Sequence, residues 1–245
     1  MGALIPVLCR PPSASAFTPL SLSPALWLDS SDLATLYQDS AGTTPVAADG
    51  DPVGKWLDKS GNGRHLTQAT AAQRPTMKAA VANGRNVVRF DGVDDNMARL
   101  SSIVSAQPLT ILSVNRYSVG NKFEYVLDGN EEVRVIHGKR NDAGDPVFVF
   151  AGSVLSGGNG AAGGYKIQTS VVNGASSILR HNKAQVATGD AGASHLGSGI
   201  VVGADKSIAA GFLDGDLCEL VIYSSALTPG QITSVESYLS TRWGV

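Results

Sequence analysis

One segment has the residue types of a binding loop: WLDKSGNGRHL, from Trp56 to Leu66. A phosphate-binding loop needs Gly-x-x-x-x-Gly-Lys-Ser/Thr before a helix, and a dinucleotide-binding loop needs Gly-x-Gly-x-x-Gly between a strand and a helix. The segment has only Gly61 and Gly63 and matches neither pattern. Asn62 before Gly63 favours positive φ, and Asp58 can accept hydrogen bonds from the backbone N–H groups of a turn. We therefore predict a tight turn held by Asp58.

The densest group of oxygen ligands is the run DGVDDN, which contains Asp91, Asp94 and Asp95 followed by Asn96. Calcium prefers several carboxylate and carbonyl oxygens, so the three aspartates are candidate calcium ligands. The alternative is a polar turn after the apolar run VVRF, in which one aspartate accepts hydrogen bonds from backbone N–H groups. The residues leave both interpretations open, and no other cofactor is predicted.

Glycoside hydrolysis requires two carboxylates close together. The nearest run is LDGDLCEL, with Asp214, Asp216 and Glu219. Because side chains alternate along a strand, this spacing predicts that Asp216 and Glu219 lie on opposite faces. Glu131 and Glu132 are adjacent and face apart for the same reason. We therefore predict no catalytic residues and no enzymatic activity.

Other catalytic and binding residues are scattered. The four histidines lie next to no cysteine or second histidine, so no zinc site is predicted. No Gly-x-Ser-x-Gly nucleophile elbow occurs in the sequence. Aromatic residues make up only 6% of the chain, and the three tryptophans lie in apolar surroundings, so no sugar-binding aromatic face is evident.

The composition predicts a packed globular protein without a nucleic-acid or membrane partner. Hydrophobic residues make up 43% of the chain, charged residues make up 16%, and the net charge of -2 gives no field that recruits polyanions. No window approaches the length of a transmembrane span. The first residues lack a basic segment, and Pro6 interrupts their apolar run, so we predict no signal peptide and synthesis in the host cytoplasm.

The chain is predicted to hold an extended N-terminal arm, residues 1–24, and one β domain, residues 25–245. The arm is rich in Pro and Ser and cannot build a core of its own. Short runs rich in β-branched and aromatic residues predict strands at 86–92, 109–117, 123–127, 133–136, 147–150, 165–172, 199–203 and 217–223. Such a series without helices predicts an all-β sandwich or jelly roll.

The final segment TPGQITSVESYLSTRWGV predicts the one clear helix. Thr228 is the expected N-cap, Pro229 suits the first turn, and Gln231 completes a capping box. Apolar residues at helical spacing form a stripe that should dock on a sheet: Ile232, Val235 and Leu239.

Three segments together resemble a known family. WLDKSGNGRHLTQATAAQRPT, NVVRFDGVDDNM and GDLCELVIYSSALTPGQITSVESYLSTRWGV are similar, in order and spacing, to the laminin-G-like branch of the concanavalin A-like lectin/glucanase jelly rolls. The resemblance covers about residues 25–245 and implies a sandwich of two antiparallel sheets. It implies function poorly, because this fold hosts lectins, hydrolases, adhesion modules and virion proteins.

Chains of this branch with a Pro-rich arm and no secretion signal resemble virion proteins of tailed bacteriophages. The resemblance implies a non-enzymatic structural protein of the virion, such as a capsid decoration, head-fibre or tail-surface subunit. Residues 1–24 would anchor it to other virion proteins or to like subunits in a homo-oligomer, and its loops would touch a cell-surface glycan. The alternatives are a free carbohydrate-binding module or lectin, and a glycoside hydrolase.

Overall fold

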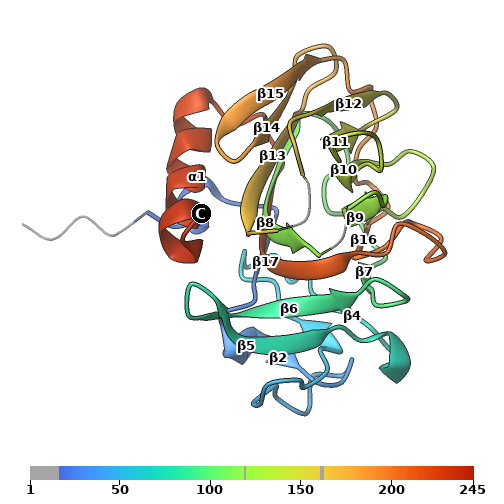
Figure 1. The fold of residues 1–245 in the computed structure, drawn as a ribbon, viewed down its shortest axis with the longest axis vertical. Coiled ribbons are helices and arrows are strands. Elements are labelled where there is room, and N and C mark those ends of the chain that lie inside the picture. The colour runs from blue at the N-terminus through green and yellow to red at the C-terminus, as the bar shows by residue number, and fades with distance from the viewer. Residues whose placement is uncertain (1–16, 119, 161–162) are drawn as a thin grey trace, which may run out of the picture.

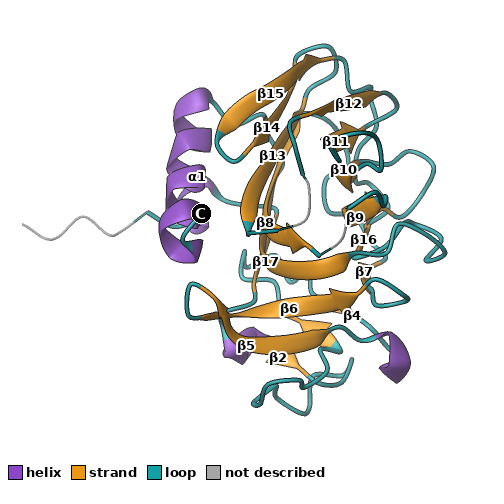
Figure 2. Cartoon of the chain, viewed as in Figure 1, coloured by secondary structure: helices purple, strands orange, loops and turns teal. Residues whose placement is uncertain are grey.

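Two antiparallel sheets face each other, and one α-helix lies on the outside of one of them (Figure 1, Figure 2). This computed structural model describes residues 17–118, 120–160 and 163–245. The arrangement confirms the predicted all-β sandwich with a C-terminal helix. Most of the predicted arm, residues 1–16, lies outside the described residues.

Sheet A has the strand order β15-β14-β13-β8-β17-β6-β5, and β1 also pairs with β17. The long strand β17 therefore joins two parts of the sheet, because its first residues pair with β6 and its later residues pair with β1. The strand bounds are β1 Leu26–Asp29, β5 Thr76–Ala82, β6 Arg85–Asp91, β8 Leu109–Tyr117, β13 Lys166–Val172, β14 Ser177–His181, β15 Ala184–Gly189 and β17 Asp214–Tyr223.

Sheet B has the strand order β12-β11-β10-β9-β16-β7-β4-β3-β2. Its strands are short, and three of them contain only two residues. The bounds are β2 Leu36–Tyr37, β3 Lys55–Trp56, β4 Leu66–Thr67, β7 Met97–Arg99, β9 Glu124–Gly129, β10 Ile136–Lys139, β11 Val147–Phe150, β12 Val154–Gly157 and β16 Ile200–Val202.

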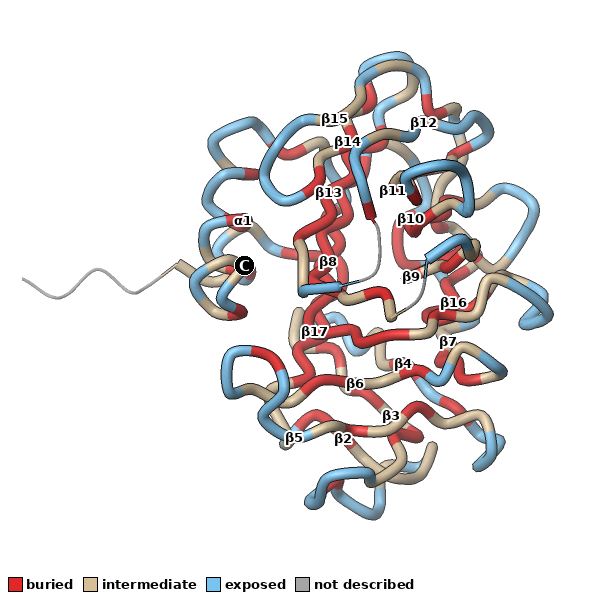
Figure 3. The backbone as a smooth tube through the Cα atoms, viewed as in Figure 1, coloured by how far each residue is buried: buried red, intermediate tan, exposed pale blue. Residues whose placement is uncertain are grey.

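The main core fills the space between the sheets (Figure 3). Alternate residues of each strand point into it, as expected for a sandwich. In β17, Leu217, Leu220 and Ile222 belong to this core, and Trp56 and Met97 reach it from sheet B. These side chains are all essentially buried. The opposite faces of both sheets are therefore the surfaces available for other contacts.

Helix α1, Pro229–Trp243, covers part of the outer face of sheet A (Figure 1). The Thr228 hydroxyl accepts a hydrogen bond from the Gln231 N–H, and the Gln231 side chain accepts one from the Thr228 N–H, so the predicted capping box is confirmed. The predicted apolar stripe is also confirmed, because Ile232, Val235 and Leu239 are buried against sheet A. The helix thus closes a second apolar cluster outside the main core.

The end of the predicted arm lies on the domain itself. Pro19–Leu22 forms a short 3-10 helix, and the Tyr223 hydroxyl donates a hydrogen bond to the Pro19 carbonyl over 3.3 Å. The Phe17 ring lies 6.4 Å from the Tyr238 ring of α1. An attachment of the preceding residues to another subunit stays a prediction.

No helix in the described part of the chain is long and apolar enough to cross a membrane.

Candidate functional site

The segment after Trp56 forms the predicted turn. The Asp58 carboxylate accepts hydrogen bonds from the backbone N–H groups of Ser60 at 2.8 Å and Arg64 at 2.9 Å. It also accepts one from the Trp27 N–H at 3.0 Å, which ties the turn to β1. Gly61 and Gly63 have positive φ of 89° and 67°, the conformation that favours glycine. The interpretation as a tight turn held by Asp58 is confirmed.

The three candidate calcium ligands lie together. One oxygen of each of Asp91, Asp94 and Asp95 falls within 4.8 Å of the others. The Asp91 carboxylate also accepts hydrogen bonds from the backbone N–H groups of Val93, Asp94 and Asp95, at 2.8, 3.2 and 3.3 Å. Burial, and next the charge of Asp91, raise the pKa of Asp95 to about 7. The polar turn is present, and calcium binding to it stays a prediction.

The predicted opposite orientation of Asp216 and Glu219 is wrong. The pairing of β17 with β8 shifts register between Leu217 and Glu219, so a bulge inserts one residue there. Asp216 faces Arg116 on the outer side of sheet A, and Glu219 lies on the same side against the tryptophans beneath α1. Because of the bulge, Asp216 and Glu219 lie on the same face of sheet A, although strict alternation along the strand would place them on opposite faces.

Both of these carboxylates are fully buried and already bonded. Asp216 binds Arg89 at 2.6 Å and Arg116 at 2.9 Å, and it accepts a hydrogen bond from the Tyr165 hydroxyl at 2.6 Å. Although burial acts to raise its pKa, the hydrogen bonds from Arg89, Tyr165 and Arg116 lower it below the usual value. These contacts make Asp216 the anchor of a cross-strand ion-pair row.

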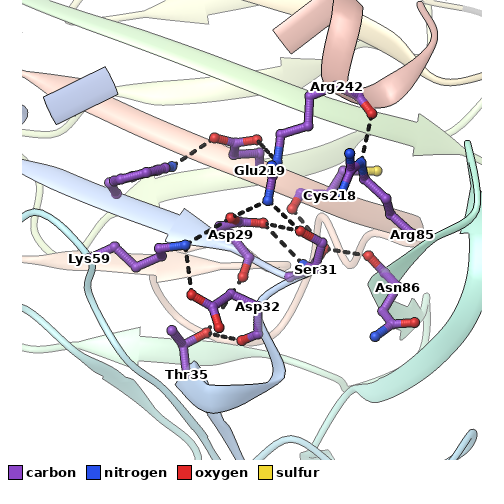
Figure 4. Close-up of polar contacts among 12 residues, drawn as sticks. Asp29, Ser31, Asp32, Thr35, Lys59, Arg85, Asn86, Cys218, Glu219 and Arg242 are labelled. Atoms are coloured by element: carbon purple, nitrogen blue, oxygen red, sulfur yellow. Dashed lines mark hydrogen bonds and ion pairs between the residues drawn. The ribbon is translucent and has the colours of Figure 1, made fainter. Parts of the chain in front are cut away.

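Glu219 is the centre of a network beneath α1 (Figure 4). Its two carboxylate oxygens accept hydrogen bonds from the indole N–H groups of Trp27 and Trp243, each at 2.7 Å. Burial, and next the charge of Asp29, raise the pKa of Glu219 to about 7. Through its bond to Trp243, Glu219 holds α1 on the sheet. The helix covers it, so a substrate has no open path to this carboxylate.

An open groove lies on the outer face of sheet B, with a volume of about 710 Å³. Its floor follows from strand alternation: Trp56, Leu66 and Met97 point into the core, so the paired residues beside them point outward. The polar lining residues are Lys55, His65, Thr67, Gln68, Thr70, Gln73, Asn96, Arg99 and Ser101. Its volume lies within the range of about 300–1,000 Å³ that is typical of ligand sites.

Hydrogen bonds fix several groove side chains. Gln68 Nε2 donates to Asn96 Oδ1 at 2.8 Å and to the Asn96 carbonyl at 3.1 Å. Lys55 Nζ donates to the Ala41 carbonyl at 3.1 Å, and Arg99 Nη1 donates to the Gly63 carbonyl at 3.2 Å. The Arg99 bond joins the groove to the Asp58 turn. Gln68, which also accepts the Thr70 N–H, and Asn96, which donates to the Asp94 carbonyl, are buried and bonded within the protein.

His65 presents a donor to the groove. Its Nδ1 accepts the Asp58 backbone N–H at 3.0 Å, so in the neutral ring the proton sits on Nε2. Burial, and next the charge of Lys55, lower its pKa. The groove thus combines amides, an imidazole N–H and two cationic side chains.

A second polar cluster lies inside the sandwich, at Glu124, Lys139 and Asp145. Lys139 and Glu124 are paired across β10 and β9 and are fully buried. Lys139 Nζ lies 3.2 Å from Glu124 Oε2 and 3.2 Å from Asp145 Oδ1. The two carboxylate oxygens are therefore separated by no more than twice that distance. Burial raises the pKa of Glu124, the direction expected for a group that must carry a proton.

A cavity of about 10 Å³, room for no more than a water molecule, lies beside Tyr117, whose ring is close to Lys139. It is lined by Asn115, Tyr117, Lys166, Gln168 and His181 together with Gly160 and Gly164. The Tyr117 ring lies 5.6 Å from Lys139 Nζ, and its hydroxyl donates to Gln168 Oε1 at 3.2 Å. Neither this cluster nor the groove was predicted from the sequence, because their residues belong to segments that meet only in the folded sheets.

Neither a protein-family model nor a curated protein matches the sequence. Solved structures do share the fold. A GH54 α-L-arabinofuranosidase aligns with a TM-score of 0.67 and 14% identity over 93% of this chain and 66% of its own. The sialidase of Trypanosoma rangeli aligns with a TM-score of 0.58 and 10% identity over 89% of this chain and 32% of its own. This chain therefore spans only part of either protein.

A third similar structure is a single domain. Domain 4 of AbnA, a GH43 extracellular arabinanase from Geobacillus stearothermophilus, was solved in complex with arabinotriose. It aligns with a TM-score of 0.57 and 12% identity over 77% of this chain and 100% of its own.

These similarities contradict the prediction of a non-enzymatic bacteriophage virion protein. The proteins named above are glycosidases or a domain of one, and nothing among them supports a virion role or the absence of enzymatic activity. The misleading signal was the Pro-rich start of the chain, which carries no information about the chemistry of the domain behind it. The chain has the fold of these carbohydrate-active proteins.

Proposed function

We propose that this chain is a carbohydrate-active protein that binds an oligosaccharide in the groove over β3, β4 and β7. The observation that carries the proposal is the groove itself, a hollow of about 710 Å³ whose polar lining includes Thr67, Thr70, Gln73 and Ser101. Sugar hydroxyls both donate and accept hydrogen bonds, and side-chain amides offer both functions. The bound arabinotriose in a domain of similar fold supports this class of ligand.

Apolar edges complete the groove. Leu100 is 70% exposed and Ile208 is 37% exposed, and both line the groove. Exposed aliphatic side chains at the edge of a groove can pack against the C–H face of a sugar ring. The groove therefore offers polar contacts to hydroxyl groups and apolar contacts to ring carbons.

A glycan screen followed by calorimetry tests this proposal. Arabinotriose and a panel of oligosaccharides are titrated against the whole chain. Gln73→Ala, which removes an amide from the groove, should weaken binding by about tenfold, the value of one or two hydrogen bonds. The matched control is Gln185→Ala, an exposed glutamine on β15 of sheet A, which should leave binding unchanged. Absence of saturable binding across the panel would reject the proposal.

Glycoside hydrolysis is a second candidate function, supported by the glycosidases of similar fold; the candidate pair of carboxylates is at Lys139, where Glu124 is fully buried. Glu124 and Asp145 hold oxygens within twice 3.2 Å of each other. The raised pKa of Glu124 suits a general acid.

Release of reducing sugar from arabinan and related polysaccharides tests this second function. Glu124→Gln and Asp145→Asn should each lower the rate by about 100-fold or more, as expected for loss of a general acid or base. Glu131→Gln, at an exposed site, is the control. Melting temperatures of all variants separate lost chemistry from lost folding. If the unmodified chain releases no sugar, hydrolysis is excluded and binding alone remains.

A further inference from the structure

The groove carries an unusual balance of charge. Lys55, His65 and Arg99 line it, and none of its described lining residues is an aspartate or glutamate. The chain as a whole has 21 acidic and 19 basic residues. The groove therefore has a positive electrostatic potential, although the protein as a whole has slightly more acidic than basic residues.

The two cations in the groove are not neutralised within the described residues. Lys59, Arg89, Arg116 and Arg242 each form an ion pair with a buried acid. By contrast, Lys55 Nζ and Arg99 Nη1 contact the carbonyl oxygens of Ala41 and Gly63. A carbonyl holds the position of a cation but does not cancel its charge.

Arg99 also has an unused donor. Its Nε is buried and has no hydrogen-bond partner among the described residues. Arg99 and Lys55 approach the groove from different strands, β7 and β3, with Thr67 of β4 between them in the pairing order. Both lower the pKa of His65, after burial, so all three basic side chains lie within electrostatic reach of one another. Asp58 acts on His65 in the opposite direction from the turn behind it.

We infer that the groove selects an acidic glycan, with the carboxylate of a uronic acid unit held by Lys55 and Arg99. This inference rests on the proposed function, because it names the ligand class of the same groove. A carboxylate supplies the charge that the lining lacks, and arginine binds it through paired N–H groups while lysine acts as a point charge. The Gln73 amide then contacts the neutral hydroxyl groups.

A matched pair of ligands tests the inference. An oligogalacturonide is compared by calorimetry with its carboxyl-reduced form, a neutral oligosaccharide of the same length. The acidic form should bind at least about tenfold more tightly, since charge-assisted hydrogen bonds are the stronger ones. Its affinity should fall as NaCl rises, because salt screens exposed charges, while the affinity of the neutral form stays constant.

Variants assign the effect to the groove. Lys55→Gln and Arg99→Gln should each lower the ratio of acidic-form affinity to neutral-form affinity by about tenfold. Arg99→Lys keeps the charge but loses the paired N–H groups, so it should keep part of the preference and bind the acidic form less tightly than the unmodified chain. Lys78→Gln, on β5 of sheet A, is the control and should change neither affinity. Melting temperatures check that each variant is folded.

Each outcome decides between the two claims. Equal affinity for both ligands overturns the acidic selectivity and leaves oligosaccharide binding in the groove standing. A preference that survives both Gln variants overturns the assignment to Lys55 and Arg99. Absence of binding to either ligand, and to the wider panel, rejects the groove as a glycan site altogether.

Discussion

Asp29 and Glu219 lie directly opposite each other on β1 and β17, and both side chains are completely buried. Arg242, near the end of α1, places Nη2 2.7 Å from Asp29 Oδ2 and Nε 3.5 Å from Glu219 Oε2 (Figure 4). Lys59 adds a second cation, with Nζ 3.0 Å from Asp29 Oδ2. Two facing acids in a buried site repel each other, so these cations make the docking of α1 on sheet A possible.

Removal of Arg242 should therefore be costly. Arg242→Leu leaves Asp29 and Glu219 buried with one cation fewer, and we expect a loss of about 3–5 kcal/mol in the free energy of unfolding. Urea denaturation measures it. Arg140→Leu, which breaks an ion pair with the half-exposed Asp142, is the matched control and should cost about 0–1 kcal/mol. Equal effects of the two changes would contradict a docking role for Arg242.

The pKa of Asp95 predicts a pH dependence. Burial raises this pKa to about 7, whereas an unfolded aspartate titrates near about 3.9, so the folded protein holds the proton more tightly. Stability from this group is thus present at acid pH and is lost as the pH rises from about 4 through 7. Asp95→Asn has no carboxyl to titrate, and its side-chain oxygen can still accept the Asp91 N–H. As the pH rises across this window, the free energy of unfolding of the variant should therefore increase relative to that of the wild type by on the order of 1 kcal/mol.

Urea denaturation of both proteins at several pH values between 4 and 8 checks this dependence. An exposed aspartate changed in the same way, Asp190→Asn, should show no such trend. A constant difference between wild type and Asp95→Asn at all pH values would contradict the raised pKa.

Calcium binding to the same turn has a distinct signature. If Asp91, Asp94 and Asp95 hold Ca²⁺, a free concentration of about 100 times Kd adds about 2.7 kcal/mol to the free energy of unfolding. The melting temperature of the wild type should then rise with Ca²⁺ and fall with EDTA, and Asp95→Asn should respond to neither. If neither Ca²⁺ nor EDTA changes the melting temperature of the wild type, the metal hypothesis is rejected.

The capping box of α1 gives a local stability prediction. Thr228→Ala removes the hydroxyl that accepts the Gln231 N–H and should cost about 1 kcal/mol. Thr241→Ala, at an exposed position in the last turn of the helix, is the control and should be nearly neutral. Thermal or urea unfolding measures both. A loss at Thr241 as large as that at Thr228 would show that general helix propensity, and not the cap, is responsible.

The features that the sequence predicted well are local ones. The Asp58 turn and the Thr228 cap depend on residues a few positions apart, and side-chain chemistry alone specifies them. Two hairpins were missed although their turns carry a local signal. Asn83 and Gly84, and Asn182 and Lys183, all have positive φ, as two-residue hairpin turns require.

The features that depend on strand pairing could not be predicted. The bulge in β17 exists only in its register with β8, and this one inserted residue turns Glu219 to the side of Asp216. Lys55, His65 and Arg99 become neighbours only when β3, β4 and β7 pair. Glu124 and Asp145 meet only through the buried Lys139. Local patterns in a single sequence do not indicate which strands pair or in which register, so these contacts cannot be predicted from them.

Chemical-shift mapping of a bound oligosaccharide tests the central claim most directly. The chain is labelled with ¹⁵N and titrated with the tightest ligand from the glycan panel while backbone amide shifts are recorded. The account predicts that the largest shifts fall on residues 65–70 and 96–101, together with the side-chain amides of Gln68, Gln73 and Asn96. Shifts confined to any other face, or no shifts with any glycan, would contradict it.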